Sequence, residues 1–137
     1  MAEDCVFCKI VSGKIPSTKL FEGATVLSFL DIAPAAKGHA LVIPKKHCAS
    51  LLGVPHEELM ELIVAVQKVA AAVMKATKAD GFNVLESNEK AAGQVIPHVH
   101  FHVIPRWAGD GLHLGWEQGT PDKAELEALA KLVKKHL

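Results

Sequence analysis

The sequence has no excess of charge of either sign. Lys and Arg together number 15 among 137 residues, and Asp and Glu also number 15. Proteins that bind a nucleic-acid backbone carry a surplus of basic residues, so this composition disfavours a large polyanionic partner and still allows a small anion in a local pocket. Long apolar runs are also missing, since no stretch reaches the roughly 20 residues that cross a bilayer. We expect neither nucleic acid nor a membrane as a partner.

The N-terminus lacks the features of a secreted protein. It reads MAEDCVFCKIVSGKIP, with acidic residues where a signal peptide is basic and with lysines interrupting the apolar stretch. Cysteine is scarce, because Cys5 and Cys8 form a C-x-x-C pair and Cys48 stands alone. An odd number of cysteines fits a reducing compartment better than a disulfide framework. We therefore expect a mature N-terminus and a cytoplasmic location.

No internal repeat or low-complexity linker divides the chain. We expect residues 1–137 to form one domain around one core. Apolar alternation and turn residues predict strands at residues 19–22, 25–31, 39–44, 82–87 and 98–105. The short connections favour antiparallel pairing. The prediction is an α+β domain with a five-stranded antiparallel sheet.

Three helices are expected beside this sheet. A short one surrounds the N-terminal cysteine pair. The long one begins near Pro55, carries apolar residues at the helical period and is ended by Gly81. A closing C-terminal helix is expected after Thr120 as its N-cap, with Pro121 at its first position. The apolar face of that closing helix is formed by Leu126, Leu129, Ala130 and Val133.

The segment PHVHFHVIP, residues 97–105, holds three of the chain's eight histidines. His98, His100 and His102 occur at every second position. Residues two apart share one face in a strand but not in a helix, and the flanking prolines disfavour a helix interior. The spacing therefore predicts a strand with three imidazoles on one face. Taken alone, this row is compatible with a solvated polar face, a metal site, or an acid-base or nucleophilic centre.

HVHFHVIPR also fits the H-x-H-x-H pattern, with apolar residues at x, of the histidine triad family. KIVSGKIPSTKLFE, VLSFLDIAPAAKGHALVIPKKH and AAGQVIPHVHFHVIPR resemble segments of that family in the same order, up to about Arg106. Members of the family are nucleotide-binding hydrolases and transferases that act at the α-phosphate of nucleotide conjugates. The sequence most resembles the branch that cleaves adenosine 5′-monophosphoramidates. The resemblance implies a purine nucleotide such as AMP, or its conjugates, as the binding partner.

The resemblance also implies roles for the histidines and an oligomeric state. His100 is the expected nucleophile, which forms a covalent nucleotidyl-histidine that water hydrolyses, and His102 donates to the phosphate. With His98, these residues form the expected catalytic row. A homodimer is implied in which two five-stranded sheets join near the long helix. The apolar run LIVAVQKVAAAV of that helix is compatible with this contact and equally with burial inside one subunit.

The substrate-binding residues are likewise carried over from the resemblance. Asp31 matches a ribose-binding carboxylate, although an aspartate before Pro34 is also a common turn residue. Gly93 and Gln94 are expected to contact phosphate, with a plain turn as the alternative. Val95 stands where the branch often has a serine, which leaves His102 or a water as the proton donor to the leaving group. The full expected set is Phe7, Ile10, Phe29, Asp31, Ile32, His39, Ser87, Asn88, Gly93, Gln94 and Val95.

A second group of residues has the composition of a metal site. Two thiols and two imidazoles, from Cys5, Cys8, His47 and His98, suit tetrahedral zinc, although their spacing is not that of a zinc finger. Family members that begin C-x-F-C-K-I, as CVFCKI does here, bind structural zinc through these positions. The alternative is a reduced, buried cysteine pair without metal.

Three functional hypotheses follow. The first is a hydrolase of nucleoside 5′-monophosphate conjugates, and the second is a nucleotide-binding scaffold whose hydrolysis is incidental. In the third, the three histidines hold a catalytic metal, which leaves Asp31 and the AGQ segment without a role. The resemblance thins after Arg106, and whether Trp107 or Trp116 reaches the leaving group is not assigned.

Overall fold

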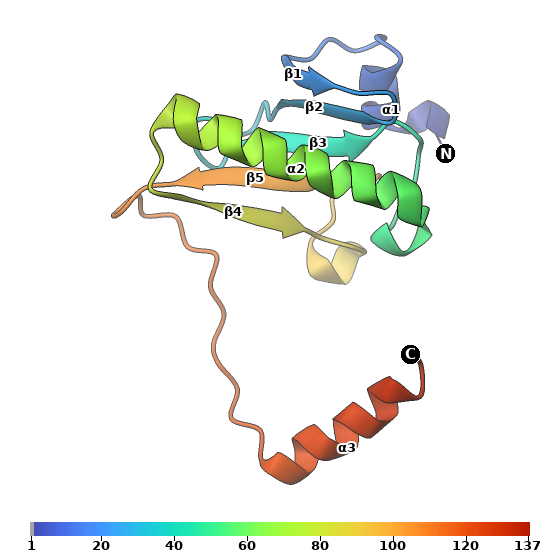
Figure 1. Ribbon diagram of the computed structural model, residues 1–137, viewed down its shortest axis with the longest axis vertical. Coiled ribbons are helices and arrows are strands. Elements are labelled where there is room, and N and C mark those ends of the chain that lie inside the picture. Colours follow the sequence, from blue (N-terminus) through green and yellow to red (C-terminus); the bar gives the residue numbers. More distant parts are fainter. Residues whose placement is uncertain (1) are drawn as a thin grey trace.

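The computed structural model describes residues 2–137 and has one five-stranded antiparallel sheet (Figure 1). The strands follow the order β1-β2-β3-β5-β4 across the sheet, so β1 and β4 are its edges. The α+β prediction is confirmed. The strands are β1 Lys19–Glu22, β2 Val26–Leu30, β3 Ala40–Pro44, β4 Gly81–Glu86 and β5 Phe101–Arg106. The helices are α1 Val6–Val11, α2 His56–Thr77 and α3 Lys123–Lys134, with short 3-10 turns η1 Ala2–Asp4, η2 Leu51–Gly53 and η3 Lys90–Ala92.

The sheet is covered on both faces. The long helix α2 lies across one face (Figure 1), where its buried stripe packs against residues such as Val42 and Val103. On the other face α1 contributes Phe7 and Ile10 to a second cluster that contains Phe29. Because neighbouring residues of a strand point to opposite faces, β3 is buried along its whole length. The functional side chains lie on the face covered by α1.

The strand that carries the histidine row is shorter than predicted. It was expected at residues 98–105, but β5 begins at Phe101 and ends at Arg106. The amide of Val99 donates to the carbonyl of Cys48, and the imidazole of His98 contacts the carbonyl of Pro44 at 2.8 Å. These bonds replace the strand ladder before Phe101. His98 and His100 therefore lie in irregular chain, and His102 alone lies within β5.

Two helix ends also differ from their predictions. Helix α2 ends at Thr77, where Lys78 adopts a left-handed backbone with φ 53° and its amide donates to the carbonyl of Met74. Gly81, expected to end this helix, begins β4 instead. Helix α3 is capped by Asp122, whose side chain accepts from the amide of Glu125, and not by Thr120. A carboxylate caps a helix better than a hydroxyl placed two residues too early.

The closing helix does not close the domain. Helix α3 follows an extended segment that leaves the sheet beyond β4 (Figure 1), and none of its residues is buried. Its apolar face is exposed, with Leu126 at 53% and Leu129 at 58%. Among the described residues, no helix combines the length and apolar character needed to span a membrane.

Candidate active site

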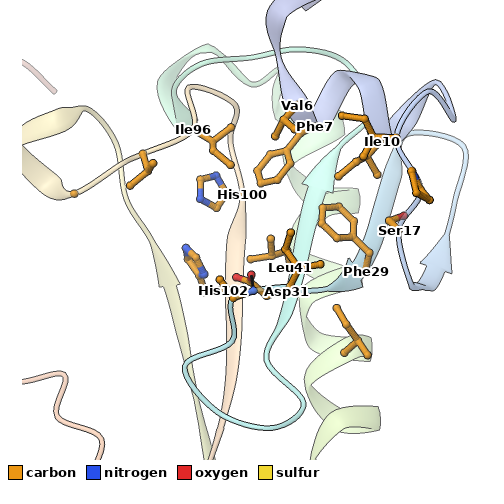
Figure 2. A pocket seen from close by; sticks show the side chains of 17 residues that line it. Val6, Phe7, Ile10, Ser17, Phe29, Asp31, Leu41, Ile96, His100 and His102 are labelled. Carbon is orange, nitrogen blue, oxygen red and sulfur yellow. Dashed lines mark hydrogen bonds between the residues drawn. The ribbon is translucent and has the colours of Figure 1, made fainter.

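A cavity of about 450 Å³ opens on the face of the sheet covered by α1. His100 and His102 stand on one side of it, and the aromatic rings of Phe7 and Phe29 on the other (Figure 2). Asp31 lies near His102. Of the expected substrate-binding residues, the cavity is lined by Phe7, Ile10, Phe29, Asp31, Ile32, Gly93 and Val95.

Aromatic contacts define the apolar part of this cavity. The Phe7 ring packs edge-on against Phe29, with centroids 5.6 Å apart, and against His100, with centroids 5.1 Å apart. Sequence reasoning missed several lining residues, among them Leu41 and Ser17. Leu41 pairs with Phe29 in the sheet, so strand register would have found it. The cavity is an apolar slot with titratable groups at one end, which suits a flat ring joined to a polar group.

The tautomer of His100 follows from its backbone partner. Its Nδ1 lies 2.6 Å from the carbonyl oxygen of His98. A carbonyl oxygen only accepts, so Nδ1 carries the proton. The other ring nitrogen, Nε2, therefore holds a free lone pair. A buried imidazole oriented in this way is a competent nucleophile.

The proton positions on His39 and His102 follow in the same way. The amide of Ala35 donates to Nδ1 of His39 at 3.0 Å, which leaves the His39 proton on Nε2. That Nε2–H donates to Nδ1 of His102 across 2.9 Å. His102 then carries its own proton on Nε2. Beside the lone pair of His100, the site thus presents an N–H donor.

Burial favours the neutral forms of His39 and His102. Burial, together with the smaller effects of the neighbouring His100 and His39, lowers the pKa of His102 to about 4. Burial also lowers the pKa of His39, against the opposing effect of Asp31, whose carboxylate oxygen is 3.6 Å from its Nε2. Desolvation disfavours the charged imidazole, and the two adjacent rings add charge repulsion.

Asp31 stabilises a turn and also lines the cavity. One carboxylate oxygen accepts from the amide of Ala33 at 2.8 Å and so stabilises the turn after β2. The other lies toward His39, and the residue lines the cavity. One oxygen is therefore left for a ligand hydroxyl.

Four expected binding residues do not line the cavity: His39, Ser87, Asn88 and Gln94. His39 lies behind His102, as described above. The Gln94 side chain accepts from the amide of Glu89 and donates to the carbonyl of Ala49, both at 2.8 Å. Asn88 accepts from the amide of Leu51 at 2.7 Å. These two amides hold the loop around η3 in place.

Gly93 is the loop residue that faces the cavity. Its φ of 85° is left-handed, and a Cβ there would meet no atom within 4 Å. Glycine is favoured here by backbone conformation and not by lack of space. Gly93 lines the cavity with backbone atoms alone.

Cys5, Cys8, His47 and His98 form a second cluster behind the histidine row. Their ligand atoms all lie within 4.8 Å of one another. Nδ1 of His98 is 3.4 Å from the sulfur of Cys5 and 3.6 Å from that of Cys8, which is 3.4 Å from Nδ1 of His47. Tetrahedral zinc with bonds of about 2.3 Å to sulfur and about 2.0–2.1 Å to nitrogen separates S and N by about 3.6 Å. The donor set and its spacing fit that ion.

The surroundings of the cluster agree with metal binding. The Nε2 of His98 contacts the carbonyl of Pro44 at 2.8 Å, which places the proton on Nε2 and leaves Nδ1 as the ligand atom. Without a cation, burial and the neighbouring Cys5 raise the pKa of the Cys8 thiol to about 11. A divalent cation reverses this preference, because it binds the thiolate.

The fold and the site together define a class of protein: an α+β domain with a histidine pair at the end of an apolar slot and a four-residue cluster of metal-ligand type. The family model described as "HIT domain" matches residues 12–109. The chain belongs to the HIT family.

Relatives and solved structures extend this similarity over nearly the whole chain. An uncharacterized HIT-like protein of Methanocaldococcus jannaschii is 48% identical, over 95% of this chain and 98% of its own length. The adenosine 5′-monophosphoramidase hnt1 of Schizosaccharomyces pombe is 44% identical, over 94% and 95%.

Among solved structures, a Streptococcus mutans protein is 46% identical and superposes with a TM-score of 0.93 over 97% of this chain and 85% of its own. A HIT family protein of Bacillus anthracis, 35% identical, also scores 0.93, over 100% and 99%. A zinc-bound histidine triad protein of Mycobacterium smegmatis is 38% identical and scores 0.78, over 98% and 99%.

We predict that His102 stays neutral well below physiological pH. Its pKa of about 4 lies under the unperturbed value of about 6.5, so at pH about 5.5 the ring should still carry one proton, on Nε2. NMR of the ring nitrogens measures both the charge and the tautomer. A His102→Gln variant identifies the resonances.

The same shift makes a stability prediction with a definite sign. The folded protein binds the His102 proton less readily than the unfolded chain, so this group stabilises folding above pH about 6.5 and loses that contribution as pH falls towards about 4. Titration of His102 with a midpoint near 6.5 would contradict the burial argument.

Proposed function

We propose that the protein hydrolyses nucleoside 5′-monophosphate conjugates of the adenosine phosphoramidate type at the α-phosphate. The observation that carries the proposal is the pair of opposite tautomers at the end of the slot, with a lone pair on His100 beside an N–H on His102. The relative from Schizosaccharomyces pombe is named as an adenosine 5′-monophosphoramidase. That name supports the same substrate class.

The cavity suggests how such a substrate is held. The purine base lies in the apolar slot between Phe7, Phe29 and Ile10, and the ribose hydroxyls bind the carboxylate oxygen of Asp31 that the turn leaves free. This placement brings the α-phosphate to the histidine pair and to the open backbone at Gly93. A phosphate beside neutral N–H donors needs no net positive charge from the protein.

In the proposed reaction, Nε2 of His100 attacks the α-phosphorus. A P–N bond to His100 forms as the P–N bond to the amine breaks, and the amine leaves with a proton. The new imidazole is cationic, and its Nδ1–H strengthens its bond to the carbonyl of His98. Water then attacks the adenylyl-histidine, which releases AMP and restores the lone pair of His100.

The proton for the amine is assigned to a solvent water, because a neutral His102 would become an imidazolate if it gave up its only proton. Val95 has no proton to donate and is 89% exposed. His102 keeps its Nε2–H as a hydrogen-bond donor to a phosphoryl oxygen, and its Nδ1 continues to accept from His39. The scaffold hypothesis uses the same binding residues without turnover, so an activity measurement separates the two.

The decisive variant is His100→Ala. Wild-type protein should release amine and AMP from an adenosine phosphoramidate, and the variant should lose on the order of a thousandfold or more in kcat, because the nucleophile is gone. A His56→Ala variant, changed on the exposed start of α2, is the matched control. Mass spectrometry after an alkaline quench should find an adenylyl group on wild type only. Absence of wild-type turnover would favour the scaffold hypothesis.

We also propose that Cys5, Cys8, His47 and His98 bind structural zinc. All three cysteines are free thiols, which fits the expected reducing, cytoplasmic location. Zinc would be held by the two sulfurs and by Nδ1 of each histidine. It would give no nucleophile, because four protein ligands close its coordination shell.

Zinc content is the test of this site. Wild-type protein should carry one equivalent of zinc, and Cys8→Ala should lose most of it together with thermal stability. Cys48→Ala is the control, since that thiol lies outside the cluster and donates to the carbonyl of Ser50 at 3.1 Å. Equal zinc in the two variants would reject the assignment.

We propose in addition that the protein is a homodimer. Strand β4 is an edge of the sheet, and its Phe82 and Val84 are 45% and 42% exposed. Ile63 and Val64 of α2, 48% and 47% exposed, line the same apolar depression. An edge strand has unpaired backbone groups, and with exposed apolar side chains beside it this edge can pair with another chain. This edge patch, Ile63, Val64, Phe82 and Val84, is where the second copy would join.

A charged residue in the edge patch should break the dimer. Ile63→Lys should convert the dimer to monomer at micromolar concentration, because it buries an unpaired charge in the contact. Leu52→Lys places the same charge on a residue that is 96% exposed and outside the patch. Light scattering during size-exclusion chromatography measures both masses. Equal masses for the two variants would exclude this patch.

A further inference from the structure

Ser17 places a hydroxyl in the apolar part of the slot. The residue lies between α1 and β1 and lines the cavity together with its neighbours Ile15 and Pro16. Figure 2 shows it at the end of the slot remote from His100, beyond the ring of Phe29. This hydroxyl is therefore far from the reactive imidazole and close to where a flat ring would lie.

The hydroxyl of Ser17 is buried, and its Oγ makes no hydrogen bond to any of residues 2–137. Other serines of the chain do pair their hydroxyls, since Ser12 donates to the carbonyl of Lys9 at 3.1 Å and Ser28 donates to that of Leu41 at 2.8 Å. Buried polar atoms in folded proteins are mostly hydrogen-bonded, and leaving one without a partner costs free energy. The position of the Ser17 hydroxyl therefore calls for a partner.

The backbone on either side of Ser17 is held by hydrogen bonds. The amide of Ile15 donates to the carbonyl of Lys9 at 3.2 Å, and the carbonyl of Thr18 accepts from the amide of Leu30 at 2.9 Å. These bonds tie the segment to α1 and to β2, so the hydroxyl cannot reach a new protein partner without breaking them. The open space in front of Ser17 Oγ is the cavity, and a partner has to come from there.

The surroundings of this hydroxyl select the class of ligand. Ile10, Phe29 and the adjacent Ile15 belong to one apolar cluster and line the same cavity. Such a wall packs against the faces of a flat ring, and a single polar group in it fixes how the ring is oriented. A serine hydroxyl both donates and accepts, so it pairs with a ring nitrogen or an exocyclic amine. A heteroaromatic ring with a polar edge meets both requirements.

We propose that Ser17 recognises the base of the nucleotide through a hydrogen bond between its Oγ and the polar edge of the six-membered ring of the purine. The inference rests on the proposed function, because it takes the phosphate to lie at the histidine pair and the ribose at Asp31. The six-membered ring is the part of a purine farthest from the ribose, so its edge reaches the remote end of the slot. Ser17 is a specificity residue, since a site that hydrogen-bonds a ligand group discriminates against an analogue that lacks this group.

Two ligands of the same shape test the contact. AMP carries nitrogens and an amino group on the six-membered ring, whereas benzimidazole riboside 5′-monophosphate has only carbon there. In calorimetric titrations Ser17→Ala should bind AMP about tenfold more weakly than wild type and the benzimidazole ligand within about twofold of wild type, because only AMP loses a hydrogen bond.

Ser12→Ala is the matched control, because it removes an exposed hydroxyl from the same segment, and it should change neither affinity. An equal loss for both ligands in Ser17→Ala would indicate a general disturbance of the slot and would overturn the proposal. Unchanged AMP affinity would overturn it too, since the hydroxyl would then pair with water in the complex.

Melting temperatures give an independent readout. Because Ser17 Oγ bonds to no group of the described chain, Ser17→Ala without nucleotide should melt at or above the wild-type temperature, and AMP should raise its melting temperature less than that of wild type. A free variant that melts well below wild type would show that the hydroxyl has a partner in the folded protein and would overturn the proposal.

Turnover of an adenosine phosphoramidate by wild type, measured in parallel, keeps the two proposals separate. A wild type that binds AMP without turnover would contradict the catalytic proposal only, because the binding comparison still decides on Ser17. A wild type that binds no AMP would overturn the Ser17 proposal.

Discussion

The hydrogen bond between Nδ1 of His100 and the carbonyl of His98 is the constraint on which the site depends. At 2.6 Å it fixes both the tautomer and the orientation of the buried His100 ring. It also joins two functions in one residue, because the side chain of His98 belongs to the cysteine cluster while its carbonyl orients the neighbouring imidazole. Whatever orders His98 therefore orders His100.

This bond explains why β5 begins late. In a regular strand between two neighbours, the carbonyl of His98 would pair with a backbone amide and would not be available to a side chain. The ladder of β3 with β5 ends at the pair Val42 and Phe101, and the chain before it is held by Cys48 and Pro44 instead. The irregular backbone lets alternate histidines make different contacts: His98 with the cysteine cluster, His100 with a backbone carbonyl and His102 with His39.

The sequence predicted the architecture well, because strand and helix periodicity are local signals. The five strands, the three helices and the cysteine-histidine cluster were all foreseeable. The start of β5 was not, since it depends on a side chain to backbone bond with Pro44, more than 50 residues away. Gln94 and Asn88 were expected at the ligand, yet their amides bond to Ala49 and Leu51 across a loop that no periodicity describes. The exposed position of α3 could not be predicted from the sequence either. An apolar helix face has the same sequence pattern whether it packs within a chain or between chains.

Helix α1 links the cluster to the slot. In CVFCK, Phe7 lies between the two cysteines. Its ring packs edge-on against Phe29 in the slot and against the rings of His98 and His100, with centroids 5.8 Å and 5.1 Å from those two imidazoles. The sulfur of Cys5 caps the helix by accepting from the amide of Cys8. Ligation of both sulfurs would hold this one-turn helix more firmly than its six residues can hold themselves. The same cluster would then position the apolar wall of the slot through Phe7 and the proposed nucleophile His100 through the carbonyl of His98. The slot and the His100 ring would be held in a fixed relative position.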